Sequence, residues 1–343
     1  MILMPDDTKR IAIASQLTKM QALQTLLITN EQNLLNTVVD TEIRQQLQNM
    51  LQDDQKNMGI LETVIIQYGV KTNSRKSIQA MIEEIQDSIT NSEPTLFEQI
   101  FQQELLKHRQ IMAGLIIHKA AQIVGTDVEA AIMPLNTINF ETRAHQEQLK
   151  GILEVLGVRE LTGEEPDQGF KARVQDAAAA LTGVVGSVVT RVDEEISIRD
   201  LLLADHTKSD VLFRELLGTN DPERVQEYFG QLYQDISVHG LAEEQVLYPA
   251  LRPYYEHMQE IYEQTEEVIQ MLDDIKHLDP SEPEFKAQVE QLRVAVRAHI
   301  DQEEHDIFPK IKHNFSLEQQ QQLATEFKTA KSQLQDQYLQ NRS

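Results

Sequence analysis

The sequence predicts an all-α protein made of two helical bundles. Apolar residues recur with the helical period along most of the chain, and strict alternation over strand-like lengths is absent. Only 13 glycines and 10 prolines interrupt 343 residues, of which 41% are hydrophobic, so two domains can each bury a core. The clearest break is the stretch 157–169, rich in glycine, acid and proline, which divides the chain into two parts.

The first part predicts one bundle over residues 1–157, followed by a linker and a connecting helix over 158–192. The connecting helix contains the most apolar stretch of the chain, Ala177–Val189. Its length falls short of the roughly 20 residues that span a bilayer, so we expect it to pack between the bundles through its small residues. The amphipathic segments of the first bundle are 8–37, 40–69, 75–91, 94–124 and 127–157.

The second part predicts a four-helix bundle over residues 193–315. Asp221 and Ser281 provide capping side chains before helices that open with proline, and short loops make neighbouring helices antiparallel. We therefore expect an up-down-up-down arrangement, followed by a Gln-rich surface helix over 316–343. The four predicted helices are 195–218, 222–250, 253–277 and 283–313.

The charge of the chain argues against a nucleic-acid partner. The net charge is −24, whereas phosphate binding needs clustered lysine and arginine. Residues 193–343 hold 14 Lys and Arg against 31 Asp and Glu, a balance of −17. These carboxylates either form a solvated surface or include inward-facing ligands of a cation.

The sequence also restricts the compartment and the ligand chemistry. Cysteine is absent, which excludes disulfides and thiolate metal sites and suits a reducing cytosol. The first residues, MILMPDDTKR, lack the basic and apolar segments of a signal peptide. We therefore expect a cytoplasmic protein without a membrane partner, whose metals bind through nitrogen and oxygen.

Two copies of one motif carry the functional signal. The stretch HGLAEEQVLYP begins at His239, and HIDQEEHDIFP begins at His299, with His, Glu, Glu, an aromatic residue and Pro at identical offsets. Four residues advance a helix by about 400°, so His239 and Glu243 share a face, as do His299 and Glu303. Each pair is therefore able to grip one cation.

The duplication extends backwards to an acid followed by histidine on the preceding helix, at 205–206 and at 256–257. Two such hairpins packed face to face bring four imidazoles and two carboxylates into the bundle core. This predicts a dinuclear metal site, for which non-haem iron is the best fit and manganese or zinc would also suit. The predicted ligands are His206, His239, Glu243, His257, His299 and Glu303.

At these positions the chain resembles the hemerythrin-type HHE cation-binding family over about residues 195–313. The resemblance implies two iron ions with carboxylate bridges supplied by Glu243 and Glu303. Oxygen-carrying hemerythrins have a second histidine one turn along the third helix, where this chain has Ile261. Glu260 either replaces that ligand or is a solvated glutamate. This departure weakens the case for reversible oxygen carriage.

Several neighbours of the motif have open roles. Asp205 and Glu256 either orient histidine rings or face solvent. Tyr248 and Phe308, which precede the prolines, are expected to plug the core. His305 should point away from the site, because six residues carry it about 240° around the helix from its motif histidine.

The N-terminal bundle weakly resembles ferritin-like domains in its long paired helices. The ExxH ligand pair of such domains is missing, because none of its three histidines has a glutamate three residues earlier. Glu104 with His108 and Glu141 with His145 have spacing compatible with metal but lack a mirrored context. We therefore expect a structural or partner-binding bundle, through which self-association is also conceivable. The residues in the place of the glutamate are Leu105, Leu115 and Thr142.

Three functions fit these observations. The first is a non-haem di-iron protein that binds, senses or reacts with dioxygen, peroxide or nitric oxide, with peroxide or nitric oxide consumption as its enzymatic form. The second is an iron-responsive interaction or regulatory protein, in which metal stabilises one bundle while the other contacts a partner. The third is iron storage.

Overall fold

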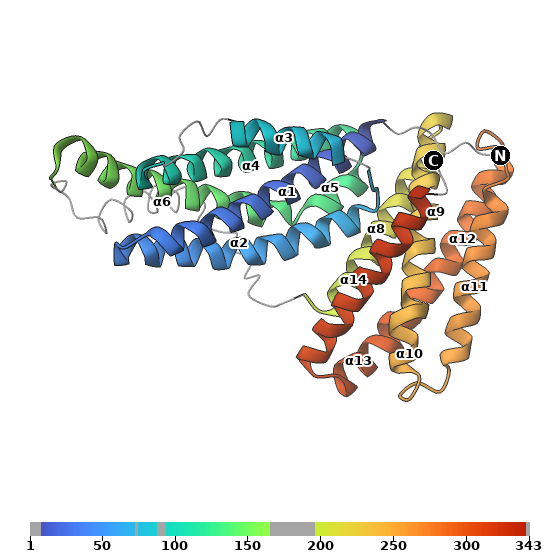
Figure 1. Cartoon of the computed structure of the whole chain (residues 1–343). Helices are drawn as coiled ribbons and strands as arrows, with labels where there is room; N and C mark the ends of the chain where they lie inside the picture. Colours follow the sequence, from blue (N-terminus) through green and yellow to red (C-terminus); the bar gives the residue numbers. More distant parts are fainter. Residues whose placement is uncertain (1–7, 73–74, 88–93, 165–195, 341–343) are drawn as a thin grey trace.

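The computed structural model describes residues 8–72, 75–87, 94–164 and 196–340 (Figure 1). Every regular element in these ranges is helical, as the sequence predicts. The stretch Ala177–Val189, expected to pack between the bundles, lies outside the described residues. Within the described ranges, no helix is both long enough and apolar enough to cross a membrane.

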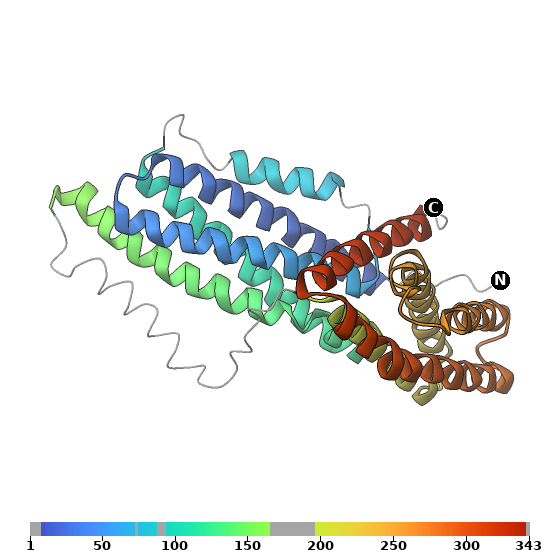
Figure 2. The ribbon, with the colours of Figure 1, turned by 90° about the horizontal axis from the view of Figure 1, so that it is seen from below.

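Four long helices form the N-terminal bundle, with the short helix α3 against its outer side (Figures 1 and 2). Met81 and Ile85 of α3 pack against Leu23, Leu27 and Leu106 of the bundle. The last helix continues past the break expected at residue 157 and ends at Thr162, with Gly163 as its C-cap. The helices are α1 (Thr8–Thr37), α2 (Thr41–Tyr68), α3 (Arg75–Asp87), α4 (Leu96–Val124), α5 (Thr126–Ile132) and α6 (Leu135–Thr162).

A buried ammonium lies at the centre of this bundle. Lys107 is 0% exposed, and its Nζ contacts Asp54, Glu31 at 3.0 Å and the ring nitrogen Nδ1 of His145 at 3.2 Å. Each of these residues comes from a different long helix. The N-terminal bundle thus neutralises its inward carboxylates with a cation of its own chain.

The two histidine and glutamate pairs noted in this bundle do not form a metal cluster. The side-chain nitrogen of Gln146 donates to Glu104 at 2.7 Å and also lies 3.2 Å from His108 Nδ1. His145 contacts Asp53 at 3.2 Å instead of Glu141. In the described part of the chain, the single group of His, Asp and Glu that could hold a metal ion lies in the other bundle.

The C-terminal bundle consists of four antiparallel helices, two of which continue through a π-helical turn. The third begins at Met258, five residues later than predicted, because residues 252–257 form turns rather than a helical start. The elements are α8 (Ile198–Gly218), α9 (Pro222–Ala242), η1 (Glu243–Leu247), α10 (Tyr248–Leu251), α11 (Met258–Ile275), α12 (Pro283–Gln302), η2 (Glu303–Ile307) and α13 (Phe308–Asn314).

The final helix, α14 (Leu317–Gln340), lies between the two bundles (Figure 1). One face of it enters the hydrophobic core of the C-terminal bundle, with Phe327 fully buried. Its other contacts reach α2. The predicted surface helix is therefore also a packing element of the metal-binding half.

The end of α2 is docked into the C-terminal bundle through its backbone. The last carbonyls of a helix have no partner within the helix. Here Lys208 of α8 donates to the carbonyls of Gln67 at 2.7 Å and Tyr68 at 3.0 Å, and the side chain of Gln234 donates to the carbonyl of Gly69. The junction therefore satisfies helix-end carbonyls that would otherwise need water.

Helix α14 completes the same junction. Gln335 donates to the carbonyl of Ile66 at 2.8 Å. Lys71, just beyond α2, donates to the carbonyl of Ser332 at 2.9 Å and to Asp336 at 2.8 Å. The N-terminal bundle therefore fixes the position of α14 along the C-terminal bundle.

Substitution of Gly69 by alanine tests the importance of this junction. Its φ of 80° lies in the left-handed region, and a Cβ there would overlap Asp235. Gly163 has a φ of 72° with open space around it, so it is a matched control. We expect Gly163→Ala to lower the free energy of unfolding by about 1 kcal/mol. Gly69→Ala should cost at least about 1 kcal/mol more through overpacking, as measured by denaturant unfolding. Equal losses would contradict the docking role of Gly69.

The carboxyl group of Glu31 generates a pH prediction. Burial raises the pKa of Glu31 to about 7, despite the opposing attraction of Lys107. Because this pKa exceeds that of the unfolded chain, the contribution of Glu31 to stability is fully present below about pH 4.5 and is lost as the pH rises through 7. Glu31→Gln should therefore lose less stability than the unmodified protein between pH 5 and pH 8 in thermal unfolding. Glu62→Gln, at an exposed position of α2, is the control and should follow the unmodified protein.

Candidate metal centre

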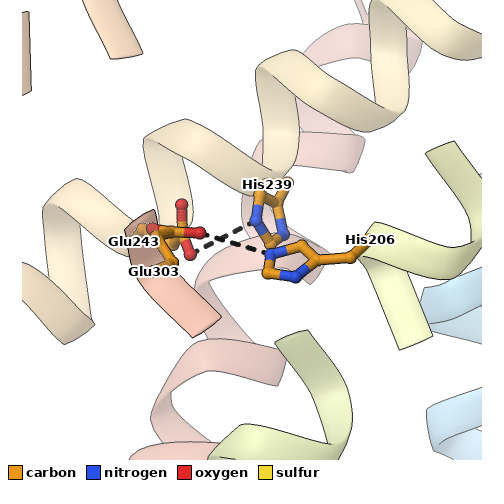
Figure 3. A group of neighbouring side chains, drawn as sticks. All are labelled: His206, His239, Glu243 and Glu303. Atoms are coloured by element: carbon orange, nitrogen blue, oxygen red, sulfur yellow. Dashed lines mark ion pairs between the residues drawn. The ribbon is translucent and has the colours of Figure 1, made fainter. Parts of the chain in front are cut away.

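Five of the six predicted ligands meet in the core of the C-terminal bundle. The tightest group is His206 of α8, His239 of α9, Glu243 of η1 and Glu303 of η2, whose ligand atoms all lie within 4.8 Å of one another (Figure 3). His299 of α12 lies beside them, with its Nε2 3.5 Å from Glu303 Oε1. The duplicated motif therefore does place both histidine and glutamate pairs on one buried face.

Each histidine presents its Nε2 atom to a carboxylate. His206 Nε2 lies 3.3 Å from Glu303 Oε2, and His239 Nε2 lies 3.2 Å from Glu243 Oε1 (Figure 3). Both glutamates are 0% exposed. Solvent therefore cannot satisfy these carboxylates.

Three of these converging atoms lack a hydrogen-bond partner, namely His206 Nε2, Glu243 Oε1 and Glu303 Oε2. Unpartnered buried polar atoms cost on the order of 1 to 3 kcal/mol each. A bound cation would satisfy all three at once. The mixed nitrogen and oxygen donor set fits a first-row transition metal such as iron.

The outer Nδ1 atom of each histidine is held by a different side chain. Asp205 Oδ2 lies 2.9 Å from His239 Nδ1, so Asp205 is one of the ring-orienting residues that the sequence left open. Glu304 Oε1 lies 3.0 Å from the Nδ1 of His206. The amide oxygen of Gln264 lies 3.2 Å from the Nδ1 of His299. Such contacts fix the tautomer that leaves Nε2 free for a metal.

The π-helical turns explain how the motif works. In each copy the N–H of the aromatic residue donates to the carbonyl of the glutamate five residues earlier, as Tyr248 does to Glu243. The proline that follows each aromatic residue, Pro249 or Pro309, has no N–H and disfavours a regular α-helical turn there. The wider turn carries an aromatic residue into the site, where Tyr248 contacts the glutamates and Phe308 contacts His206. π-turns of this kind are frequent at functional sites.

Tyr248 is more than the core plug that the sequence suggests. Its hydroxyl lies 3.1 Å from Glu243 Oε2 and 3.1 Å from Glu303 Oε1. Burial and the charges of both glutamates raise the pKa of Tyr248 well above its usual value, so it remains a donor. Phe308, its counterpart in the second motif, stacks on the ring of His206 with centroids 6.0 Å apart.

The electrostatic environment gives the two carboxylates, Glu243 and Glu303, different pKa values. Burial and the neighbouring charge of Glu303 raise the pKa of Glu243. Burial also acts to raise the pKa of Glu303, but His299 and His206 outweigh it and hold that pKa below its usual range. Like charges in one buried site titrate apart in this way unless a cation separates them.

Asp205 is held in its charged form by contacts on both sides. Burial acts to raise the pKa of Asp205, but Lys331 and His239 together hold it well below its usual range. This residue therefore brings a negative charge to the outer edge of the site.

The structure does not bring the sixth predicted ligand, His257, to the cluster. His257 precedes the first turn of α11 and is 62% exposed, and its Nδ1 lies 3.1 Å from the equally exposed Glu260. His206 lies 33 residues before its motif histidine and His257 lies 42 residues before its own, so the two hairpins are not equivalent. Helix α11 turns Gln264 and Thr265 toward the site instead.

Sequence reasoning missed Glu304, Gln264 and Lys331. An α-helical register places Glu304 away from the motif histidine, and no motif marks Gln264 or Lys331. His305 does point away, because it is exposed and its Nδ1 bonds to the carbonyl of Asp301 at 2.7 Å.

A small cavity of about 30 Å³ adjoins the cluster. His206, His239 and His299 line it, and the remainder of the lining is mainly aliphatic, including Val268 and Ile300. This volume holds a water molecule or a ligand of similar size. A larger substrate would not fit.

Comparison with known proteins agrees with this geometry. Residues 197–311 match the family model of the hemerythrin HHE cation binding domain. A Nostoc sp. (strain PCC 7120) protein named DNA nickase is 51% identical over 334 residues, covering 96% of this chain and 95% of the relative. An uncharacterized hemerythrin-like protein from Schizosaccharomyces pombe is 24% identical over 139 residues, covering 39% of this chain and 68% of the relative. No solved structure matches significantly.

The expectation that nucleic acid is not a partner is therefore wrong, since the relative that covers nearly the whole chain is named for an action on DNA. The net charge misled because a sum over the whole chain does not show where lysines and arginines lie together on the surface. The C-terminal half of this chain carries a hemerythrin HHE cation-binding domain, and the chain as a whole belongs to the same family as the Nostoc DNA nickase.

Proposed function

We propose that this protein is a cytoplasmic non-haem di-iron protein that nicks DNA. The iron part of the proposal rests on the three converging atoms without hydrogen-bond partners. The DNA part rests on 51% identity over 96% of the chain to a protein named DNA nickase. The side chains that would hold iron are His206, His239, Glu243, His299 and Glu303.

Iron, when bound, would supply binding and reduction of a small molecule such as dioxygen, peroxide or nitric oxide. The cavity beside the cluster supports a ligand of this size. The chain's own contribution is to orient three imidazoles and to hold the hydroxyl of Tyr248 near both carboxylates. Manganese or zinc would find the same donors, and metal analysis distinguishes them.

The enclosure of the site limits how it can serve DNA cleavage. Glu243 and Glu303 are fully buried, and a cavity of about 30 Å³ does not admit a phosphodiester. The metal centre therefore does not touch the DNA in this proposal. It controls nicking through a small reactant or through the packing of the C-terminal bundle.

This second route connects with the iron-responsive regulatory function. Helix α14 contacts both the motif helix α9 and α2 of the N-terminal bundle. A change in packing around the metal is thus able to reach the other bundle. Iron storage has less support, because a single metal-binding group occurs among the described residues.

Metal analysis tests the iron assignment. Protein loaded with ferrous iron without oxygen should retain about two iron ions per chain, and Glu243→Ala and Glu303→Ala should each lower this number. Glu244→Ala is the matched control and should leave the iron content unchanged. Glu304→Ala should bind iron more weakly, since it frees His206 Nδ1. A folded, metal-free protein after loading would exclude the assignment.

A plasmid assay tests the DNA assignment. Supercoiled plasmid incubated with purified full-length protein should become open circular, which gel electrophoresis detects. The double variant Glu243→Gln/Glu303→Gln should nick more slowly, because iron would no longer be held. Buffer with the same iron content but no protein controls for breaks made by free iron. If the unmodified protein leaves the plasmid supercoiled, the DNA assignment is wrong, and equal nicking by the variant would separate nicking from the metal centre.

A further inference from the structure

A lysine outside the matched family domain reaches the edge of the metal centre. Lys331 of α14 lies 20 residues beyond the domain's last matched position, 311, and is 4% exposed. Its Nζ lies 2.7 Å from both carboxylate oxygens of Asp205, to which it donates hydrogen bonds. A buried lysine held this closely has little freedom to move.

The contact continues into the metal centre. Asp205 lies 2.9 Å from the Nδ1 of His239, and the Nε2 of that ring faces Glu243 Oε1 at 3.2 Å. When the neutral ring donates its Nδ1 proton to Asp205, Nε2 carries no proton and is free to bind a metal, whereas the imidazolium ion carries a proton on both nitrogens. The series of contacts from Lys331 to Glu243 thus passes through one imidazole ring, that of His239.

Helix α14 also packs directly against this ring. Phe327, one turn before Lys331, is fully buried and meets the ring of His239 edge to face, with centroids 6.0 Å apart. His239 is therefore held by α14 in two ways, by an aromatic contact on the ring and by a charged contact through Asp205.

The outer contacts of the other two histidines are different, although the ring of His206 also has an aromatic neighbour, Phe308. His206 Nδ1 contacts Glu304, whose side chain is 29% exposed, and His299 Nδ1 contacts the uncharged Gln264. The three rings therefore differ in how firmly their tautomer and orientation are fixed. Asp205, the Nδ1 partner of His239, is itself buried and held by a lysine.

We propose that Lys331 is a positioning residue of the metal centre. By holding Asp205 in place, it fixes the tautomer and orientation of His239, and so makes the metal ion at His239 bind more tightly than it otherwise would. This inference rests on the proposed iron site. It assigns a role in metal binding to a helix that lies outside the recognised domain.

The junction between the bundles determines where Lys331 lies. Gln335, one turn after Lys331, donates to the carbonyl of Ile66 at the end of α2. Lys71 is bonded to Ser332 and Asp336 on the same helix. Both bundles thus contribute to the position of the lysine.

The test compares full-length variants by two measurements. Nitrogen-15 NMR of the metal-free protein reports how fast the Nδ1 proton of His239, which is bonded to Asp205, exchanges with water, and competition with a chelator under anaerobic conditions reports the affinity for ferrous iron. Lys331→Met should speed this exchange and weaken one bound ion by about 10- to 100-fold. Lys331→Arg should restore most of the affinity. Lys328→Met, on the same helix but without a contact to Asp205, should match the unmodified protein.

A second variant separates positioning from folding. Asp205→Asn/Lys331→Met replaces the buried ion pair by neutral groups of similar size, so it should fold even if Lys331→Met alone does not. Its iron affinity should stay low. Recovery of full affinity in this variant, or unchanged Nδ1 proton exchange and affinity in Lys331→Met, would overturn the inference. If the unmodified protein takes up no iron, the proposed iron site fails, while the exchange measurement on the metal-free protein still decides the role of Lys331.

Discussion

Two fully buried carboxylates, Glu243 and Glu303, face each other across the core of the C-terminal bundle, and their separation from water constrains everything around them. Such groups are costly unless neutralised. The bundle surrounds them with three imidazoles and with the hydroxyl of Tyr248. The π-turn at each glutamate brings an aromatic residue into the same layer. The outer contacts of the histidines then keep the inner nitrogen atoms pointing inward. The motif, the turn and the outer contacts therefore all help to stabilise two carboxylates that are buried away from water.

The two halves of the chain stabilise their buried carboxylates differently. In the N-terminal bundle Lys107 lies among Glu31, Asp54 and His145, so the counter-charge is covalently part of the chain. In the C-terminal bundle the core carboxylates face histidines and one phenol, and three converging atoms are left without hydrogen bonds. The first bundle therefore supplies a cation of its own to its core carboxylates, whereas the second depends on protons or on an added cation. This contrast agrees with the single candidate metal centre among the described residues.

The sequence predicts much of this arrangement because its signals are local. Helical period and capping residues predict the helices, and a spacing of four residues predicts that His239 with Glu243, and His299 with Glu303, share a face. The prediction fails for His257, where an apparent repeat was extended over hairpins of different length. The role of Lys331 could not be predicted for another reason. Its partner, Asp205, lies 126 residues earlier, and no local pattern marks the pair. The charge argument against DNA failed similarly, because a sum over the sequence does not show where basic residues lie together on the surface.

The long separation between Asp205 and Lys331 also bears on the order in which the molecule matures. Contacts between distant residues close large loops, and they form late relative to contacts within hairpins. The helices α8, α9, α11 and α12 are joined by short connections and can assemble before α14 docks. An intermediate with this partial assembly would already present the carboxylates to an incoming ion while the ring of His239 is still free to rotate. Docking of α14 would then hold the ring of His239 in place, so that the ion dissociates more slowly. Only the fully folded chain would retain its metal.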